Sequence, residues 1–210
     1  IMVVSKLGAA VALARLVTGA GEALALPLVT AGLLSITVAV IASFAQTDLR
    51  RLMAWSAVAH AGFLAVGAAS GTTPTQTVVF YVIGYGSAAL LGYACLAGTG
   101  TGPVPLSALR PGGSVHLGPA RAIGLMFSLL SLAGVPPFPG FADKLAVLQA
   151  AWGSWGVGVV AVAALGGVVG TVYYLRPLPD LLAQASETRS ESTFGALAAT
   201  GLGLFAVVFL

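Results

Sequence analysis

Long apolar stretches separated by short polar turns run through the chain from one end to the other. A membrane-spanning helix needs roughly 20 mostly apolar residues, because the hydrocarbon core is about 30 Å thick and a helix rises about 1.5 Å per residue. The segments that meet this requirement are 1–17, 24–45, 52–70, 75–98, 120–151, 155–176 and 193–210. The pattern therefore predicts an all-α bundle of about seven spans, forming a single transmembrane domain over 1–210.

The longest apolar segment, 120–151, would measure about 48 Å as one straight helix, which exceeds the hydrocarbon core. Its middle holds three prolines, which lack an amide donor, and two flanking glycines: Pro136, Pro137, Pro139, Gly134 and Gly140. Because the helical hydrogen bonds cannot continue through such a cluster, we expect two half-helices joined inside the membrane by 134–140. Shorter turns are expected at 18–21 and 70–74.

Charged residues are too few for a soluble protein. They make up 7% of the chain, whereas hydrophobic residues make up 58% and the mean hydropathy is +1.01. About a quarter of a globular sequence is normally charged, so a soluble enzyme domain is excluded. The basic residues are scattered singly and form no patch for nucleic acid. A single cysteine, Cys95, permits no internal disulfide.

Arginines concentrate in alternate loops. The loops at 46–51, 99–121 and 176–192 contain Arg50, Arg51, Arg110, Arg121, Arg176 and Arg189, whereas the opposite loops contain only Arg15. By the positive-inside rule, the arginine-rich loops are cytoplasmic. Ile1 and Leu210 both lie inside apolar segments, and we expect the chain to be a fragment of a longer protein.

Three titratable residues fall inside predicted spans: Lys6, His60 and Lys144. A charged lysine at the bilayer centre costs roughly 2.5 to 3.5 kcal/mol, and it persists where it faces the bundle interior, a partner or water. Lys144 follows the proline cluster, so it should lie near mid-membrane. It could serve as a proton relay, or it could simply pair with Asp143 or with a backbone carbonyl freed by the break. Lys6 could be buried or could reach the interface.

His60 lies about nine residues past Arg51, which places it about 14 Å into its span. Histidine titrates near neutral pH and can pass a proton between its two ring nitrogens. The alternative is a neutral structural histidine, and no second ligand at a useful spacing supports a metal site. Tyr85 could bridge waters between His60 and Lys144, although an ordinary packed tyrosine is the simpler interpretation.

Two motifs carry a resemblance to a known family. Residues 46–62, QTDLRRLMAWSAVAHAG, and residues 132–144, LAGVPPFPGFADK, resemble signature elements of the antiporter-like subunits of respiratory complex I. Residues 4–9 look like the family's lysine helix, and residues 173–176 resemble the end of its next-to-last core helix. A lysine after the break and a tyrosine at position 85 look most like subunit N of bacterial NADH:quinone oxidoreductase.

The resemblance implies two inverted five-helix repeats with a hydrated charged axis through the membrane centre. The segment 1–17 would be the last helix of the first repeat, 24–176 the second repeat, and 193–210 a closing helix. Family roles carried over are Lys6 as a linking lysine, His60 as a central relay and Lys144 as the terminal proton-loading group. Trp55 and Ala57 replace the family's usual tyrosine and serine, so a polar contact near His60 would be missing.

The resemblance therefore implies proton translocation in the inner membrane of a bacterial cell. This chain would carry no cofactor, flavin and iron–sulfur clusters would belong to partner subunits, and its neighbours would be other antiporter-like membrane subunits and the lipid bilayer. A fragment lacking the family's first broken helix, and the glutamate that pairs with its lysine, could not complete a pump alone. Two alternatives stay open: a subunit of a multi-subunit Na⁺/H⁺ antiporter or membrane-bound hydrogenase, and a structural membrane element that does not pump.

Overall fold

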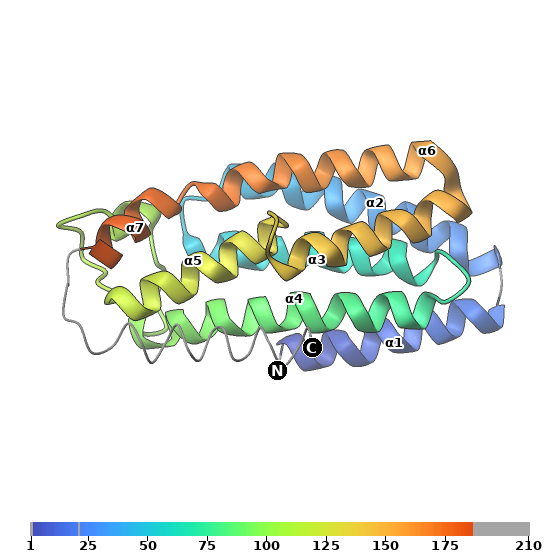
Figure 1. Ribbon diagram of the computed structural model, residues 1–210, viewed down its shortest axis with the longest axis horizontal. Coiled ribbons are helices and arrows are strands. Elements are labelled where there is room, and N and C mark those ends of the chain that lie inside the picture. Colours follow the sequence, from blue (N-terminus) through green and yellow to red (C-terminus); the bar gives the residue numbers. More distant parts are fainter. Residues whose placement is uncertain (1, 21, 187–210) are drawn as a thin grey trace.

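The computed structural model describes residues 2–20 and 22–186, and the secondary structure over this part of the chain is almost entirely helical. Figure 1 shows long helices packed side by side in an elongated bundle. The elements are α1 (Met2–Ala20), α2 (Glu22–Phe44), α3 (Leu49–Ala68), α4 (Pro74–Leu96), the 3₁₀ turns η1 (Ala97–Thr99) and η2 (Leu106–Leu109), α5 (Pro119–Ala133), α6 (Pro139–Leu175) and α7 (Leu178–Ser186). The closing helix expected at 193–210 lies outside the described residues.

The predicted helix break is present in the middle of the bundle. Helix α5 ends at Ala133, and Gly134 follows it in the left-handed conformation with φ 78° and ψ 41°. Helix α6 then begins at Pro139, where a proline costs no hydrogen bond because the first amides of a helix are unpaired. The short non-helical segment that connects the two helices lies near the centre of the view in Figure 1. The break therefore exposes the last carbonyls of α5 well away from either end of the bundle.

Helix α6 reverses direction at Gly156. This residue has φ 71° and ψ −168°, a conformation that is readily adopted only by glycine. The part before it, 139–155, and the part after it, 157–175, run in opposite directions, as the turn beside the α6 label in Figure 1 shows. The two parts correspond to the end of the predicted segment 120–151 and to the predicted segment 155–176.

Two local expectations were wrong. Helix α1 continues to Ala20, where the sequence pattern predicted a turn at 18–21, because a glycine inside a helix costs only about 1 kcal/mol. The predicted loop at 176–192 contains the nine-residue helix α7. This helix is held by Gln184, whose amide donates to Leu109 O and Val115 O and accepts from Leu117 N. Such contacts come from a distant loop and leave no local pattern.

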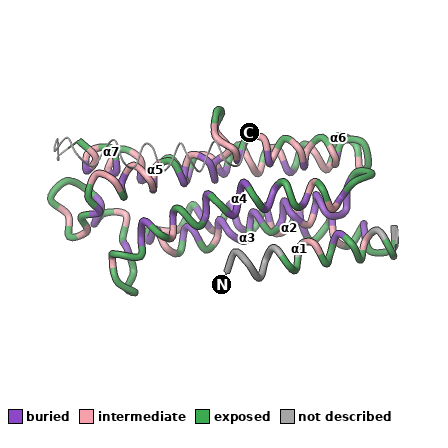
Figure 2. Tube along the Cα trace, turned by 60° about the horizontal axis from the view of Figure 1, so that its bottom comes forward, coloured by how far each residue is buried: buried purple, intermediate pink, exposed green. Residues whose placement is uncertain are grey.

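The outer surface of the bundle is apolar and its interior contains polar groups. Within the described part, three helical stretches are long and apolar enough to cross a membrane, namely Ala23–Phe44, Pro74–Thr99 and Pro139–Ser186. Large apolar side chains on α2 and α6 are exposed, such as Leu34 at 66% and Val168 at 69%. Buried positions concentrate along α3 and α4 (Figure 2). A soluble protein rarely exposes apolar patches of this extent, so this surface suits a lipid environment.

Candidate functional site

His60 lies on α3 at the centre of a hydrogen-bonded chain of side chains. Its ring is 4% exposed. Nδ1 lies 2.7 Å from the hydroxyl of Tyr81 on α4, and Nε2 lies 3.3 Å from the hydroxyl of Tyr174 on α6. A neutral imidazole donates from one nitrogen and accepts at the other, and a hydroxyl can do both. The ring is therefore connected on both sides to groups that can give or receive a proton.

The chain of hydroxyls continues past Tyr174. Its hydroxyl is hydrogen-bonded to Ser56, which lies one turn before His60 on α3. Both groups are almost completely buried, at 1% and 2% exposed. The substitutions at Trp55 and Ala57 were expected to remove a polar contact near His60. In the structure, tyrosines from α4 and α6 supply polar contacts to the ring instead.

Lys144 lies on α6, one turn after the break, and its ammonium group reaches back to the end of α5. Nζ donates to Leu132 O at 2.9 Å and to Ala133 O at 2.7 Å. These carbonyls have no partner within their helix, because the last four carbonyls of a helix never do. A cation at this position also interacts favourably with the negative end of the helix dipole. The sequence left open whether Lys144 pairs with Asp143 or with a backbone carbonyl freed by the break. The hydrogen bonds in the structure are to the freed carbonyls.

The preceding carbonyls of α5 are bonded by the turn itself. Leu130 O accepts from the amides of Gly134 and Val135, and Ser131 O accepts from the amide of Gly134. The hydroxyl of Thr171 adds a second donor to Ala133 O at 3.2 Å. Leu132 O therefore accepts a hydrogen bond from Lys144, and Ala133 O accepts one from Lys144 and one from Thr171.

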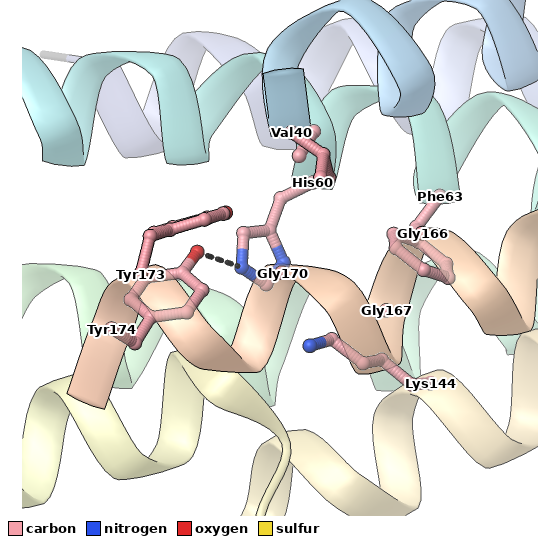
Figure 3. Close-up of a pocket in the computed structure, with 10 residues that line it drawn as sticks. Val40, His60, Phe63, Lys144, Gly166, Gly167, Gly170, Tyr173 and Tyr174 are labelled. Atoms are coloured by element: carbon pink, nitrogen blue, oxygen red, sulfur yellow. Dashed lines mark hydrogen bonds between the residues drawn. The ribbon is translucent and has the colours of Figure 1, made fainter. Parts of the chain in front are cut away.

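His60 and Lys144 line the same small cavity between α3 and α6 (Figure 3). About 10 Å³ of it is open to the centre of a water molecule, which corresponds to roughly one water. Three glycines of α6 contribute no side chain and so leave this space open. The residues around it are Val40, Ala59, His60, Phe63, Lys144, Gly166, Gly167, Gly170, Tyr173 and Tyr174. The amine of Lys144 also lies 5.8 Å from the centre of the Phe63 ring.

Tyr85 contacts His60 through its ring. The two rings are stacked with centroids 4.4 Å apart and an angle of 25° between their planes. The hydroxyl of Tyr81, one turn earlier on the same helix, bonds to Nδ1 of the imidazole. Sequence reasoning missed Tyr81, although the spacing of four residues places both tyrosines on one face of α4. The water-bridging role of Tyr85 stays a prediction.

Lys6 lies on α1, and its side chain is outside the described part of the structure. Helix α1 packs against α3 and α4, the helices that carry His60 and Tyr81. Asp143, which the sequence offered only as an ion-pair partner of Lys144, is 2% exposed. Over residues 2–20 and 22–186, no three histidine, cysteine or acidic side chains are grouped so as to hold a metal ion.

Comparison with known proteins identifies relatives over most of the chain. A subunit N of NADH-quinone oxidoreductase from Geobacter metallireducens is 31% identical over 205 residues, which cover 95% of this chain and 44% of the relative. An NAD(P)H-quinone oxidoreductase subunit 2 from Synechococcus elongatus is 32% identical over 163 residues, which cover 76% of this chain and 31% of the relative. The chain thus spans less than half the length of these curated relatives.

A solved structure shares the fold. In respiratory complex I from Thermus thermophilus with bound aureothin, one chain matches with a TM-score of 0.69 and 32% sequence identity, over 88% of this chain and 43% of that one. Residues 1–171 match the family model described as NADH:quinone oxidoreductase/Mrp antiporter, transmembrane. This match extends from α1 through the histidine of α3 and the lysine of α6. The chain therefore belongs to the NADH:quinone oxidoreductase/Mrp antiporter transmembrane family.

Proposed function

We propose that this chain carries protons within the membrane as part of an antiporter-like subunit of a bacterial NADH:quinone oxidoreductase, most similar to subunit N. The observation that carries the proposal is that His60 and Lys144 line one cavity, although they come from helices far apart in sequence. The names of the curated relatives support the assignment to this complex. The apolar surface and the bacterial relatives support a place in the inner membrane.

The proton path follows the hydrogen-bonded side chains. His60 accepts a proton at one ring nitrogen and releases one from the other, toward Tyr81 on one side or toward Tyr174 and Ser56 on the other. A water molecule in the cavity would connect the imidazole with the amine of Lys144. Lys144 then binds or releases the proton, and its contact with the end of α5 favours the charged form.

A change in a neighbouring charge is sufficient to drive this step. A unit charge about 8 Å from the amine contributes roughly 2 kcal/mol at an effective dielectric constant of about 20. Because 1.4 kcal/mol corresponds to a factor of ten, this changes the equilibrium constant for proton binding at Lys144 by more than tenfold. Redox chemistry would remain with partner subunits that hold the flavin and iron–sulfur clusters, and this chain would act through its protonation states.

The wider architecture of the proposal follows the family pattern. Segments 1–17 and 24–176 would belong to two inverted repeats, with 193–210 as a closing helix and Lys6 linking the two halves of the proton path. Neighbouring antiporter-like subunits and the bilayer would surround the chain. The remainder of the subunit would complete the path, since the chain covers less than half of its relatives.

A multi-subunit Na⁺/H⁺ antiporter is the second candidate, because the description of the matching family includes the Mrp antiporters. The proteins that copurify with the chain distinguish the two. Flavin- and iron–sulfur-containing partners support the oxidoreductase, and a membrane complex without redox groups supports the antiporter. The same purification would identify a membrane-bound hydrogenase by its metal-containing subunit.

Replacement of Lys144 by alanine tests the proposal in the intact complex. We expect Lys144→Ala to slow proton transfer through the chain by about a hundredfold or more, the usual contribution of a general acid or base. The measurement is the number of protons translocated per NADH oxidised in inverted membrane vesicles. Leu145→Ala is the matched control, because its side chain is 41% exposed on the outer surface. Full pumping by Lys144→Ala in an assembled complex would reject the proposal, and would favour a structural element that does not pump.

A further inference from the structure

Asp143 is a buried carboxyl group with an unusual environment. Its side chain is 2% exposed, and over the described residues its Oδ2 atom has no hydrogen-bond partner. A buried polar atom without a partner costs about 1 to 3 kcal/mol, more for a charged group. Such a residue weakens the fold, so a role in stabilising the helix bundle does not account for it.

Asp143 and Lys144 are adjacent on α6 but have different neighbours. The ammonium group of Lys144 reaches the end of α5, whereas the carboxyl group of Asp143 lies directly against Gly84 on α4. A side chain at position 84 would overlap the carboxyl group, so the glycine leaves the space that Asp143 occupies. Successive residues of a helix point about 100° apart, which lets one turn of α6 contact both α4 and α5.

The position against α4 brings Asp143 close to the hydrogen-bonded chain of His60. Gly84 lies between Tyr81 and Tyr85 on one face of α4. Tyr81 bonds to Nδ1 of His60, and Tyr85 stacks on the same ring. Asp143 therefore lies against the face of α4 that carries Tyr81, and it precedes Lys144 directly on α6.

We propose that Asp143 is an additional proton carrier of this chain, which connects the Tyr81–His60 pair with Lys144. The inference rests on the proposed function. In the forward step, the Asp143 carboxyl group gives its proton to the Tyr81 oxygen while Tyr81 gives its own proton to Nδ1 of His60. The products are an aspartate and a protonated imidazole, and Tyr81 is unchanged. Lys144 then reloads the carboxylate with a proton and becomes a neutral amine.

This arrangement gives the chain a second route between His60 and Lys144. One route crosses the cavity between α3 and α6, and the other passes along α4 through Tyr81 and Asp143. In this proposal, a rotation of the carboxyl group or an intervening water molecule brings Oδ2 to the Tyr81 hydroxyl. The unpartnered oxygen atom is the one available to make this contact.

Replacement of Asp143 by asparagine is the test, because it preserves shape and removes the exchangeable proton. Proton translocation per NADH and NADH-induced infrared difference spectra are measured on the intact complex, the spectra with ¹³C-labelled aspartate. In the unmodified complex we expect a labelled carboxyl band that changes on addition of NADH. Asp143→Asn should lose this band and slow proton transfer by roughly tenfold to a hundredfold. Asp180→Asn, on α7, is the matched control and should retain both.

Retention of the band or of full proton transfer in Asp143→Asn would overturn the assignment. Assembly supplies a further readout, because loss of an unpartnered buried carboxylate should leave the amount of assembled complex unchanged or raise it, whereas a structural role predicts a decrease. The two proposals fail separately. Full pumping by Lys144→Ala removes the proposed function, whereas full pumping by Asp143→Asn with a defective Lys144→Ala removes only the role of Asp143.

Discussion

Over residues 2–20 and 22–186, three helices end against a basic side chain from another segment, and one of the three contacts differs from the other two. Arg50 donates to Leu96 O at the end of α4, and Arg176 donates to Phe44 O at the end of α2. Both contacts lie at the end of the bundle that carries α7 (Figure 1). At the break in the middle of the bundle, the same task is performed by Lys144 at the end of α5.

The difference lies in what each side chain can do with its proton. A guanidinium group stays charged under all conditions met in proteins, so Arg50 and Arg176 can stabilise helix ends but cannot exchange a proton. A lysine withdrawn from water can release its proton when the neighbouring charge changes. Two of the contacts are therefore structural, and the third places the amine that the proposed function uses at the cavity beside His60.

The largest expected effect comes from replacing Lys144 at the end of α5 by an arginine, the residue type that contacts the ends of α2 and α4. Lys144→Arg retains a charged donor for Leu132 O and Ala133 O, so we expect the complex to assemble. Because the guanidinium group does not release its proton, we expect proton transfer to fall by about a hundredfold or more. The measurement is proton translocation per NADH in vesicles, together with the amount of assembled complex. Normal pumping with arginine at this position would show that the lysine acts only through its contact with α5.

A smaller effect is expected from removing one hydroxyl group of the chain around His60. Tyr81→Phe preserves the aromatic packing but removes the hydrogen bond to Nδ1, which costs about 1 kcal/mol of stability. Proton transfer should slow roughly tenfold, since the path through Ser56 and Tyr174 and the path across the cavity remain. Tyr93→Phe on the same helix is the control. Equal rates for the two variants in the vesicle measurement would exclude a role for Tyr81 in the path.

The smallest effect is expected from changing an arginine contact. Arg50→Lys retains a cation near the end of α4 but loses the planar group that reaches both Leu96 O and Thr99 Oγ1. We expect a loss of stability of about 1 kcal/mol or less and no change in proton translocation. The thermal midpoint of the purified complex measures the first quantity. A marked fall in pumping would mean that Arg50 also belongs to the proton path.

Local patterns were sufficient for the long helices from α2 to α6 and for two residues of the candidate site. The proline cluster predicted the break, and the cost of burying charge in a membrane drew attention to Lys144 and His60. The same reasoning missed Tyr81 and Tyr174, and it considered Asp143 only as an ion-pair partner of Lys144. A tyrosine in an apolar helix resembles an ordinary packed aromatic, and an aspartate beside a lysine resembles a local ion pair. Nothing in the order of residues indicates which of these side chains come to lie near His60 or Lys144.

The length of the apolar segments, the break between α5 and α6, and the presence of titratable groups within apolar helices were determined by the sequence alone. These features depend on properties of neighbouring residues: hydrophobicity, the missing amide of proline and the cost of desolvation. The partners of those groups were decided by the tertiary structure. His60 bonds to residues 21 and 114 positions away, and Asp143 lies against a glycine of another helix. Contacts between such distant segments exist only once the helices have packed, because packing sets which side chains share the dry interior of the bundle.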